Sequence, residues 1–360
     1  MGIFYKKADI PDHLQKYFVP AEIGLEETPA EYVAAMVEVF ALVRELLADD
    51  GTLWLNIGDS YYNTNPGSGG KCVLPGAGRA MREARYHNAK RDFSGTDLKP
   101  KDLIGIPWML PFALRADGWY LRQDIIWHKP NPMPESVRDR PTKAHEYVFL
   151  LSKSERYFWD AEAVREPINP NNTGVINGAP TMGAHRLAEG ARKTEKREYD
   201  EIKGANLRTV WQIATQPFSG AHFATMPPEL AERCIKAATS EKGRCPHCGA
   251  AWERVAERKA AVVKSPKSKY GNGANRNDGG RSQLVGASST TLGWSPTCSC
   301  PPHEPIPCTV LDPFGGAGTT GLVADRLQRN AILIELNPSY ADMARGRMVD
   351  DAPLFAEVNA

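Results

Sequence analysis

The pattern of apolar and polar positions predicts helices and buried strands that alternate along the chain. Between residues 29 and 48, apolar side chains recur every three or four positions, which is the spacing of a helix with one buried face. Asp49, Asp50 and Gly51 then end this helix. The nearly all-apolar run at 52–58 predicts a strand buried on both faces. A helix, a tight turn and a buried strand in succession are typical of an α/β sheet.

Further along, residues 102–114 predict a helix, and residues 119–127 and 145–152 predict two strands. A Pro-rich connection separates these strands, so we expect an antiparallel hairpin with a long tip. Residues 64–101 and 251–282 are rich in glycine and in basic residues, and residues 165–205 are polar with mixed charge. We expect these three segments to form loops or insertions.

The segment 307–348 has the order of a nucleoside-binding βαβ unit. Val310 and Leu311 end a strand, a glycine-rich turn follows, residues 319–327 continue as a helix, and a second strand at 331–334 ends in Glu335. Glycines let a ligand approach the backbone, and a carboxylate at the next strand end can accept hydrogen bonds from both ribose hydroxyls. No Gly-Lys-Ser/Thr follows the turn, which disfavours a phosphate-binding P-loop.

Composition describes an ordinary globular chain of 360 residues, 42% apolar and 24% charged, with a net charge of +1. This length fits one large domain with an insertion or two smaller domains. No apolar run approaches the roughly 18 residues that span a bilayer, so we expect no membrane association and a cytoplasmic protein. Four of the seven cysteines form two close pairs, Cys245 with Cys248 and Cys298 with Cys300. Close thiol pairs in a reducing compartment indicate a metal more often than a disulfide.

The stretch DPFGGAGTTG at 312–321, followed by IELNPSY at 334–340, resembles the S-adenosylmethionine-binding motif of DNA amino-methyltransferases. Three earlier stretches are similar to the same family in the same order: TLWLNIGDSYYN, the long segment from GWYLRQDIIWHKPNP to SERYFWD, and TVWQIATQPFSGAHFATMPPEL. The likeness covers roughly 23–240 and 306–348, in the permuted order that places the catalytic half before the cofactor half. It implies a Rossmann-like three-layer sheet with an antiparallel hairpin, S-adenosylmethionine as methyl donor and double-stranded DNA as partner, in a prokaryotic or phage-encoded protein.

Carried over position by position, the resemblance implies two sets of functional residues. The residues that would line the cofactor, with Glu335 on its ribose, are Asp312, Phe314, Gly316, Gly318, Thr319, Thr320, Glu335, His222, Phe223 and Thr225. The residues that would hold the target base or the DNA backbone, after the base has left the duplex, are Trp127, Lys129 and Asn131. A place in the core is the alternative for Trp127 and for His222. Asn56 and Asp59, at the end of a buried strand, are further candidates.

The family's Ser/Asp/Asn-Pro-Pro-Tyr/Phe motif does not occur in this sequence. Its expected place is just before the segment EIGLEETPAEYV, and one alignment puts Phe4 at the aromatic position. Two interpretations stay open: the motif lies upstream of Met1, or the chain is a non-catalytic DNA-binding or regulatory remnant that keeps the cofactor pocket. A nicotinamide-dependent oxidoreductase is a third hypothesis, which the Asp312-Pro313-Phe314 and Gly318-Thr319-Thr320 flanks of the turn disfavour.

The paired cysteines predict a small zinc-ribbon-like insertion in which Cys245, Cys248, Cys298 and Cys300 bind a structural zinc ion. The alternatives are reduced structural cysteines, or a site in which His247 or His303 replaces one thiolate. The basic segment between the pairs is then a candidate DNA contact. The sequence thus divides into a catalytic half (1–160), a variable or target-recognition segment (161–210), a cofactor half (211–240 and 306–350) and the cysteine-paired insertion (241–305).

Overall fold

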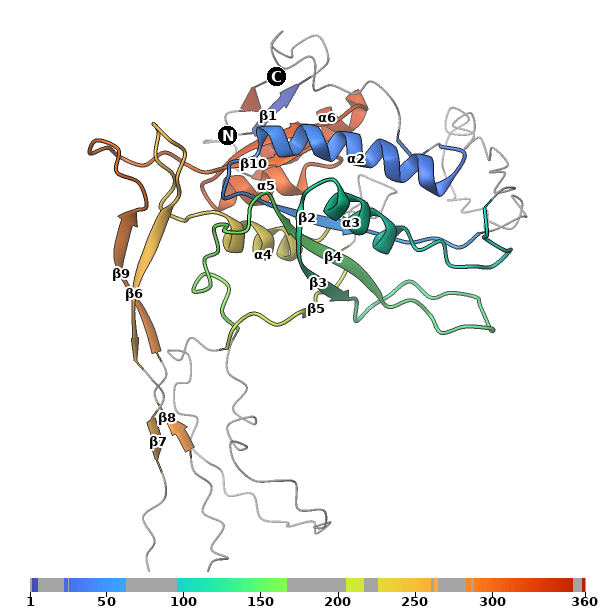
Figure 1. The fold of residues 1–360 in the computed structure, drawn as a ribbon, viewed down its shortest axis with the longest axis horizontal. Coiled ribbons are helices and arrows are strands. Elements are labelled where there is room, and N and C mark those ends of the chain that lie inside the picture. The colour runs from blue at the N-terminus through green and yellow to red at the C-terminus, as the bar shows by residue number, and fades with distance from the viewer. Residues whose placement is uncertain are drawn as a thin grey trace, which may run out of the picture. The chain divides into compact units, whose positions relative to one another are not determined.

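The chain folds into two compact units in a computed structural model, which describes residues 2–5, 23–24, 26–62, 96–166, 205–216, 226–259, 262–264, 283–285, 288–351 and 358–359 (Figure 1). Unit 1 contains Met1–Phe158, Thr209–Ala238 and Pro307–Ala360, and unit 2 contains Trp159–Arg208 and Thr239–Ile306. The predicted variable segment (161–210) and cysteine-paired insertion (241–305) both fall largely within unit 2.

Helix α2 (Pro29–Leu46) forms where the apolar spacing predicts it and ends two residues earlier than the predicted Ala48. A capping box starts the helix: the Thr28 hydroxyl accepts from the backbone N–H of Glu31 at 3.2 Å, and the Glu31 carboxylate accepts from the N–H of Thr28 at 3.0 Å. The buried stripe of the helix faces the first core of unit 1.

The first sheet of unit 1 has the strand order β2-β4-β3-β5, made of β2 (Thr52–Ile57), β4 (His145–Ser152), β3 (Tyr120–His128) and β5 (Val210–Gln212). Strands β3 and β4 pair antiparallel, which confirms the predicted hairpin. Helix α3 (Ile106–Ala116) begins four residues later than predicted. Asp59 explains this start, because its carboxylate accepts from the N–H groups of Gly105 and Ile106 at the helix N-terminus. Asp59 is thus a helix-capping residue.

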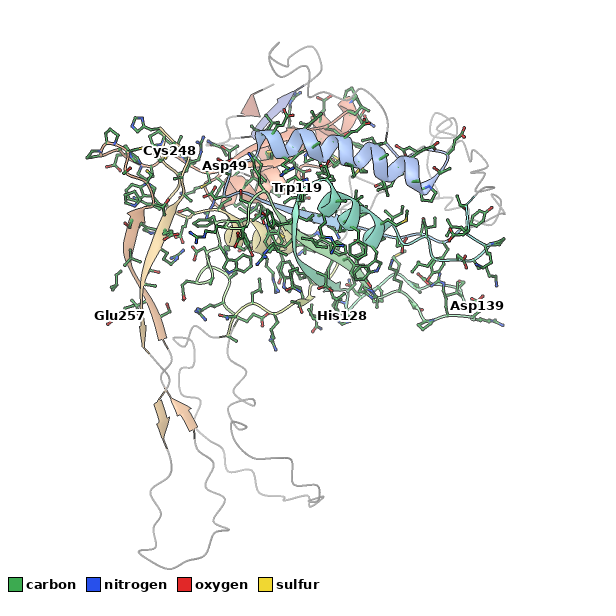
Figure 2. The ribbon with its side chains drawn as sticks, in the orientation of Figure 1. Asp49, Trp119, His128, Asp139, Cys248 and Glu257 are labelled. Atoms are coloured by element: carbon green, nitrogen blue, oxygen red, sulfur yellow. The ribbon has the colours of Figure 1, made fainter. Side chains whose placement is uncertain are left out.

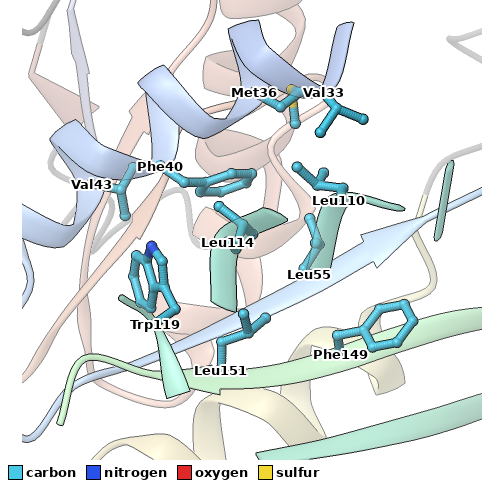
Figure 3. Packing of buried hydrophobic residues seen from close by; sticks show 10 residues of the cluster. All are labelled: Val33, Met36, Phe40, Val43, Leu55, Leu110, Leu114, Trp119, Phe149 and Leu151. Atoms are coloured by element: carbon cyan, nitrogen blue, oxygen red, sulfur yellow. The ribbon is translucent and has the colours of Figure 1, made fainter. Parts of the chain in front are cut away.

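Helices α2 and α3 pack on one face of this sheet and enclose its apolar core (Figure 3). The buried members of this core are Val33, Met36, Phe40, Val43, Leu55, Leu110, Leu114, Trp119, Phe149 and Leu151. On the opposite face, Trp54 of β2 contacts Trp211 of β5, and Arg233 of α4 (Pro228–Ala238) lies over the Trp211 ring. Alternate side chains of one strand therefore reach two layers of helices, which agrees with a strand buried on both faces.

The second sheet is wholly parallel and contains the predicted βαβ unit. Its strand order is β10-β11-β1-β12, from β10 (Thr309–Asp312), β11 (Asn330–Ile334), β1 (Gly2–Tyr5) and β12 (Val358–Asn359). Helix α5 (Thr319–Arg326) joins β10 to β11, and α6 (Pro338–Asp351) follows β11. A small-residue core with Ala324, Leu333 and Ala344 holds these helices to the sheet.

The mixed α/β architecture agrees with the prediction, but the described strands of unit 1 form two four-stranded sheets where a Rossmann-like fold has one. Among the described residues, no strand bonds to both β2 and β10, so each of these strands ends its own four-stranded sheet. Leu311 of β10 nevertheless packs against the core under α2, so the two sheets share apolar contacts. No helix in the described part of the chain is long and apolar enough to cross a membrane.

Unit 2 contains an antiparallel ladder of β6 (Trp252–Lys259) with β9 (Ser288–Pro296), and a short pair, β7 (Val262–Lys264) with β8 (Gln283–Val285). A loop or insertion was expected at 251–282, and the residues of β6 do not alternate strictly between apolar and charged, so no period-2 pattern marked this strand in the sequence.

Candidate functional site

The glycine-rich turn after β10 is held closely against the end of β11. The backbone N–H of Gly315 donates to the carbonyl of Ile334 at 2.8 Å, and the N–H of Gly318 donates to the carbonyl of Gly315 at 2.8 Å. Gly316 and Gly318 have φ values of 49° and 75°, in the left-handed region that favours glycine. A Cβ on Gly316 would make only one contact, an ordinary one with the Phe314 carbonyl oxygen at 3.8 Å. A ligand can therefore approach the backbone at Gly316.

Glu335 joins the turn to the strand end. One carboxylate oxygen accepts from the N–H of Gly316 at 2.7 Å, and the other accepts from the N–H of Asn337 at 2.8 Å. An ionised carboxylate offers about four lone-pair positions, so these two bonds leave acceptor capacity for two hydroxyl groups. The carboxylate is fixed in place before any ligand binds.

Asp312 and Thr320 bond to one another instead of pointing separately into solvent. The Thr320 hydroxyl donates to Asp312 Oδ2 at 2.6 Å, while Asp312 Oδ1 accepts from the N–H of Phe314 at 3.0 Å. Phe314 is 48% exposed, and one edge of its ring meets Phe40 at 6.3 Å between centroids. The Phe314 ring is therefore positioned by α2 and keeps a free surface.

Thr319 faces the protein interior. Its side chain is buried, and its hydroxyl accepts from the guanidinium of Arg347 at 3.0 Å. Arg347 also donates to the carbonyl of Ala317 at 3.0 Å, and burial lowers the pKa of this guanidinium. A contact between Thr319 and a cofactor would have to use its backbone N–H. Nothing in the sequence around Arg347 indicated this role, because the contact joins helices α5 and α6.

The close packing of the turn predicts opposite outcomes for two glycine substitutions. Gly318→Ala would bring a Cβ within 2.7 Å of the Ala344 Cβ at φ 75°, whereas Gly346→Ala meets nothing within 4 Å. We expect Gly318→Ala to lower the free energy of unfolding by about 2–4 kcal/mol, from left-handed strain and overpacking. Gly346→Ala, inside α6, is expected to raise it by about 0.5–1 kcal/mol.

Urea unfolding followed by circular dichroism measures both glycine variants. Equal stability of the two variants would contradict the close packing of α5 against α6.

His222, Phe223 and Thr225 lie outside the described residues, and their predicted place in the cofactor pocket stays a prediction. Phe4 lies in β1, where its backbone pairs with Leu333 of β11. This strand runs on the side of β11 away from β10, and the catalytic role assigned to Phe4 likewise stays a prediction.

The residues predicted to hold the base lie at the carboxyl end of β3. Trp127 is only 3% exposed, and its indole N–H donates to the carbonyl of Ile213 at 2.9 Å. This placement favours the alternative that Trp127 is a core residue. Asn131 exchanges two hydrogen bonds with the backbone of Thr215, at 3.1 Å and 3.0 Å. Its amide thereby ties the segment after β3 to the segment after β5.

Lys129 belongs to a polar group that the sequence analysis found only in part. Its ammonium pairs with the Glu146 carboxylate and lies 4.3 Å from the centroid of the Trp127 ring. The amide of Asn56 donates to the other Glu146 oxygen at 3.2 Å and to the Tyr147 carbonyl at 3.0 Å. Glu146 therefore bridges two residues from different strands, Asn56 of β2 and Lys129 just after β3. No local sequence signal singled out Glu146, because antiparallel pairing creates this contact.

The four predicted metal ligands converge in unit 2. The Sγ atoms of Cys245, Cys248, Cys298 and Cys300 all lie within 4.8 Å of one another. Although burial raises the pKa of Cys245, hydrogen bonds from the backbone N–H groups of Cys248 and His247 outweigh it and lower that pKa to about 6. The pKa of Cys300 rises to about 12, first because of its hydrogen bond with Cys248 and then because of burial. The crowding of four sulfur atoms suits a divalent cation that binds them all as thiolates.

The two histidines near this cluster have other contacts. His303 Nδ1 lies 2.7 Å from the carbonyl oxygen of Pro301 and 3.9 Å from Cys245 Sγ, and its ring meets His247 at 5.5 Å between centroids. Because His303 Nδ1 bonds to this carbonyl oxygen, the structure favours the four cysteine sulfur atoms, without His303, as the set of candidate metal ligands.

Arg254 anchors the β6–β9 ladder within unit 2. Its guanidinium donates to the buried carboxylate of Asp160 at 2.9 Å and to Glu241 at 2.6 Å, and it lies 4.3 Å from the centroid of the Trp294 ring. Arg254 is one of the basic residues of the predicted DNA-contacting segment. Two carboxylates hold it in the structure, so its charge serves the fold of unit 2.

Comparison with known proteins gives concordant matches. The family model described as DNA methylase matches residues 10–245 and 307–346. Type II methyltransferase M.Cfr9I of Citrobacter freundii is 37% identical over 335 residues, 93% of this chain and 77% of that relative. Type II methyltransferase M.SmaI of Serratia marcescens is 35% identical over 341 residues, 93% of this chain and 80% of that relative.

Two solved structures also match. The PvuII DNA methyltransferase (cytosine-N4-specific) has a TM-score of 0.47 at 16% identity, with 100% of this chain and 86% of that chain covered. A putative DNA modification methylase from Thermus thermophilus, complexed with S-adenosylmethionine, has a TM-score of 0.44 at 18% identity, with 94% and 86% covered. The family model and the two relatives, taken with the glycine turn and its acidic partner, show that this chain belongs to the DNA methylase family and is a DNA methyltransferase.

Proposed function

We propose that the chain transfers a methyl group from S-adenosylmethionine to the exocyclic amine of cytosine or adenine in double-stranded DNA. The observation that carries the cofactor assignment is the fixed Glu335 carboxylate, bonded at 2.7 Å to the N–H of Gly316 at the mouth of the open glycine turn. Parallel α/β sheets bind nucleoside ligands at this edge, where the carboxyl ends of the strands meet.

Each cofactor residue would have a distinct task in this pocket. Glu335 would accept hydrogen bonds from the ribose hydroxyls, Gly316 would let the ligand approach the backbone, and the exposed Phe314 ring would offer an apolar surface. Asp312 would act through the turn, since its carboxylate already holds the N–H of Phe314 and the Thr320 hydroxyl. His222, Phe223 and Thr225 would close the pocket, as the family resemblance implies.

When bound, the sulfonium of S-adenosylmethionine supplies an electrophilic methyl group for direct attack by the amine. The chain's own contribution is then to position the base and to support the charge that develops on the amine. Lys129 and Glu146, both half-buried, form with the exposed Asn56 a polar group suited to hydrogen bonds with a base edge. Trp127 and Asn131 would support this group from the core and from the loop.

We also propose that Cys245, Cys248, Cys298 and Cys300 bind one zinc ion in a small ribbon-like part of unit 2. The support is the convergence of four sulfur atoms within 4.8 Å on two short turns from distant parts of the chain. Four thiolate ligands leave no open coordination position, so the ion would be structural. Lysine and arginine residues of the segment between the pairs, other than Arg254, would contact DNA phosphates.

Transfer of radiolabelled methyl groups from S-adenosylmethionine to mixed-sequence duplex DNA tests the proposed activity. We expect incorporation into DNA, with the label recovered as N4-methylcytosine or N6-methyladenine after digestion to nucleosides. Asp312→Ala is expected to lower the rate by about 100-fold, because the turn loses two hydrogen bonds to a charged group. Asp342→Ala, at an exposed carboxylate on α6, is the matched control and should keep the wild-type rate.

Methyl incorporation by Asp312→Ala at the wild-type rate would contradict the assigned cofactor turn. Cofactor binding without any incorporation would contradict the proposed activity itself.

A further inference from the structure

The connection between β3 and β4 is a long loop that projects from unit 1 (Figure 1). It comprises residues 129–144 and closes at its base, where the N–H of Lys129 donates to the carbonyl of Ala144 at 2.8 Å. Figure 2 shows Asp139 far out on this loop, well away from His128 at the end of β3. The loop begins at the polar group of Lys129 and Glu146, so its position is set by the candidate base-holding residues.

Three contacts hold this loop from both sides. Asn131 exchanges its two hydrogen bonds with the Thr215 backbone near the start of the loop. On the returning side, Arg140 pairs with Glu135 and lies 4.1 Å from the centroid of the Tyr61 ring. Asp139 accepts from the Lys101 ammonium at 2.8 Å. The segment between Asn131 and Glu135 therefore lies between two anchored positions near the start of the loop.

Met133 lies in this segment and is 85% exposed, more than any other large apolar side chain in the described part of the chain. Its neighbours are Pro132 and Pro134. Each proline ring fixes its own φ, and the residue before a proline is restricted to extended backbone. The backbone that presents Met133 has thus lost most of its freedom before any partner binds.

The surroundings of Met133 suit a polyanion. Residues 129–144 contain four basic side chains and two acidic ones. Both acidic residues are engaged, Glu135 with Arg140 and Asp139 with Lys101. Arg138 is exposed and has no ion-pair partner within the described residues. An exposed apolar side chain on a loop with more basic than acidic residues suits contact with nucleic acid, in which phosphates flank an apolar base stack.

Methylation of an exocyclic amine requires the target base to leave the duplex, which opens a gap in the stack. Proteins that unstack DNA insert apolar side chains such as methionine between base steps. We propose that Met133 enters the base stack beside the extruded nucleotide and keeps the gap open while the base is methylated. This inference rests on the proposed function, and it assigns Met133 as a positioning residue that acts on the DNA and not on the cofactor.

The test compares two duplex oligonucleotides that carry the enzyme's own methylation site, located first by sequencing DNA that the wild-type enzyme has methylated. In one duplex the target base is correctly paired, and in the other it faces a mismatched base and is already partly unstacked. Met133→Ala is expected to lower the rate on the paired duplex by about 10- to 50-fold, and on the mismatched duplex by no more than about 3-fold. A fluorescent base analogue at the target position reports base extrusion directly. Its signal should show that Met133→Ala impairs extrusion more on the paired duplex than on the mismatched one.

Three further variants make the result specific. Met133→Leu keeps an apolar wedge and should retain most of the wild-type rate. Val137→Ala removes methyl groups from a less exposed residue of the same loop and should leave both rates unchanged. Met133→Lys adds a positive charge. If the loop only attracts phosphates, this variant should bind DNA more tightly. If Met133 is a wedge, the variant should lose methylation of the paired duplex.

If Met133→Ala lowered the methylation rate equally on both duplexes, or Met133→Lys raised it on the paired duplex, the proposed insertion of Met133 into the base stack would be overturned. A wild-type enzyme that methylates no DNA would instead overturn the proposed function, and the two failures are thereby distinguishable.

Discussion

Replacement of both Cys245 and Cys298 by serine is expected to abolish zinc binding and to unfold the cysteine-bearing part of unit 2. The two substitutions together remove one ligand from each turn, which leaves only two thiolates for the ion. Structural zinc sites contribute roughly 10–16 kcal/mol of apparent binding energy in small zinc-dependent folds, so their loss exceeds the stability of a typical small domain. Metal analysis of the purified protein should fall from about one zinc ion per chain to near zero.

The matched control removes two other thiols. Cys234 and Cys308 lie outside the cluster, and burial raises the pKa of Cys234, which suits an inert thiol. The Cys234→Ala, Cys308→Ala protein should therefore keep its zinc. Limited proteolysis within 239–306 reports unfolding and should increase only when the paired cysteines are changed. Equal zinc content in the two proteins would contradict the four-sulfur site and favour the alternative of reduced structural cysteines.

Replacement of Glu335 by alanine is expected to raise the dissociation constant for S-adenosylmethionine by about 100-fold or more. The variant loses two acceptors for the ribose hydroxyls, and hydrogen bonds to a charged group are each worth about 1.5–3 kcal/mol. It also leaves the N–H groups of Gly316 and Asn337 without the acceptors that now hold the turn to the strand end. Isothermal titration of the cofactor analogue S-adenosylhomocysteine measures the change without turnover.

Glu335→Gln separates these two contributions. Its amide keeps one carbonyl oxygen as an acceptor and offers an N–H₂ where Glu335 now accepts a second bond, so we expect a smaller loss of about 10-fold. Asp342→Ala again serves as the control at an exposed carboxylate. An unchanged dissociation constant for Glu335→Ala would mean that the ribose lies elsewhere, and would remove the main support for the assigned pocket.

The elements that periodicity alone could indicate were predicted well. Strand β4 (His145–Ser152) has the bounds that the sequence indicated, and α2 and the βαβ unit from β10 to β11 differ by only a few residues at their ends. These elements bury a continuous stripe or face, and burial leaves a pattern in the sequence. The start of α3 was placed wrongly, because it depends on Asp59, far back in the chain.

Candidate residues divide in the same way. Asp312, Gly316 and Glu335 could be found because the turn and its acidic partner form a short motif. Phe40, Arg347 and Glu146 could not, since each reaches the site from another helix or strand. Trp127 and Asn131 were identified as positions of interest, but their contacts with Ile213 and Thr215 tie them to the protein itself.

The sequence by itself determined the family, the alternation of helices and strands, the glycine turn with its carboxylate, and the pairing of the cysteines. These features depend on neighbouring residues or on short repeats, which a chain carries in any conformation. Only the tertiary structure decided that four sulfur atoms converge, that Arg254 serves unit 2, that Glu146 bridges two strands and that Met133 stands exposed on a fixed loop. Such contacts join segments distant in sequence, and packing and hydrogen bonding select them only when the chain has folded.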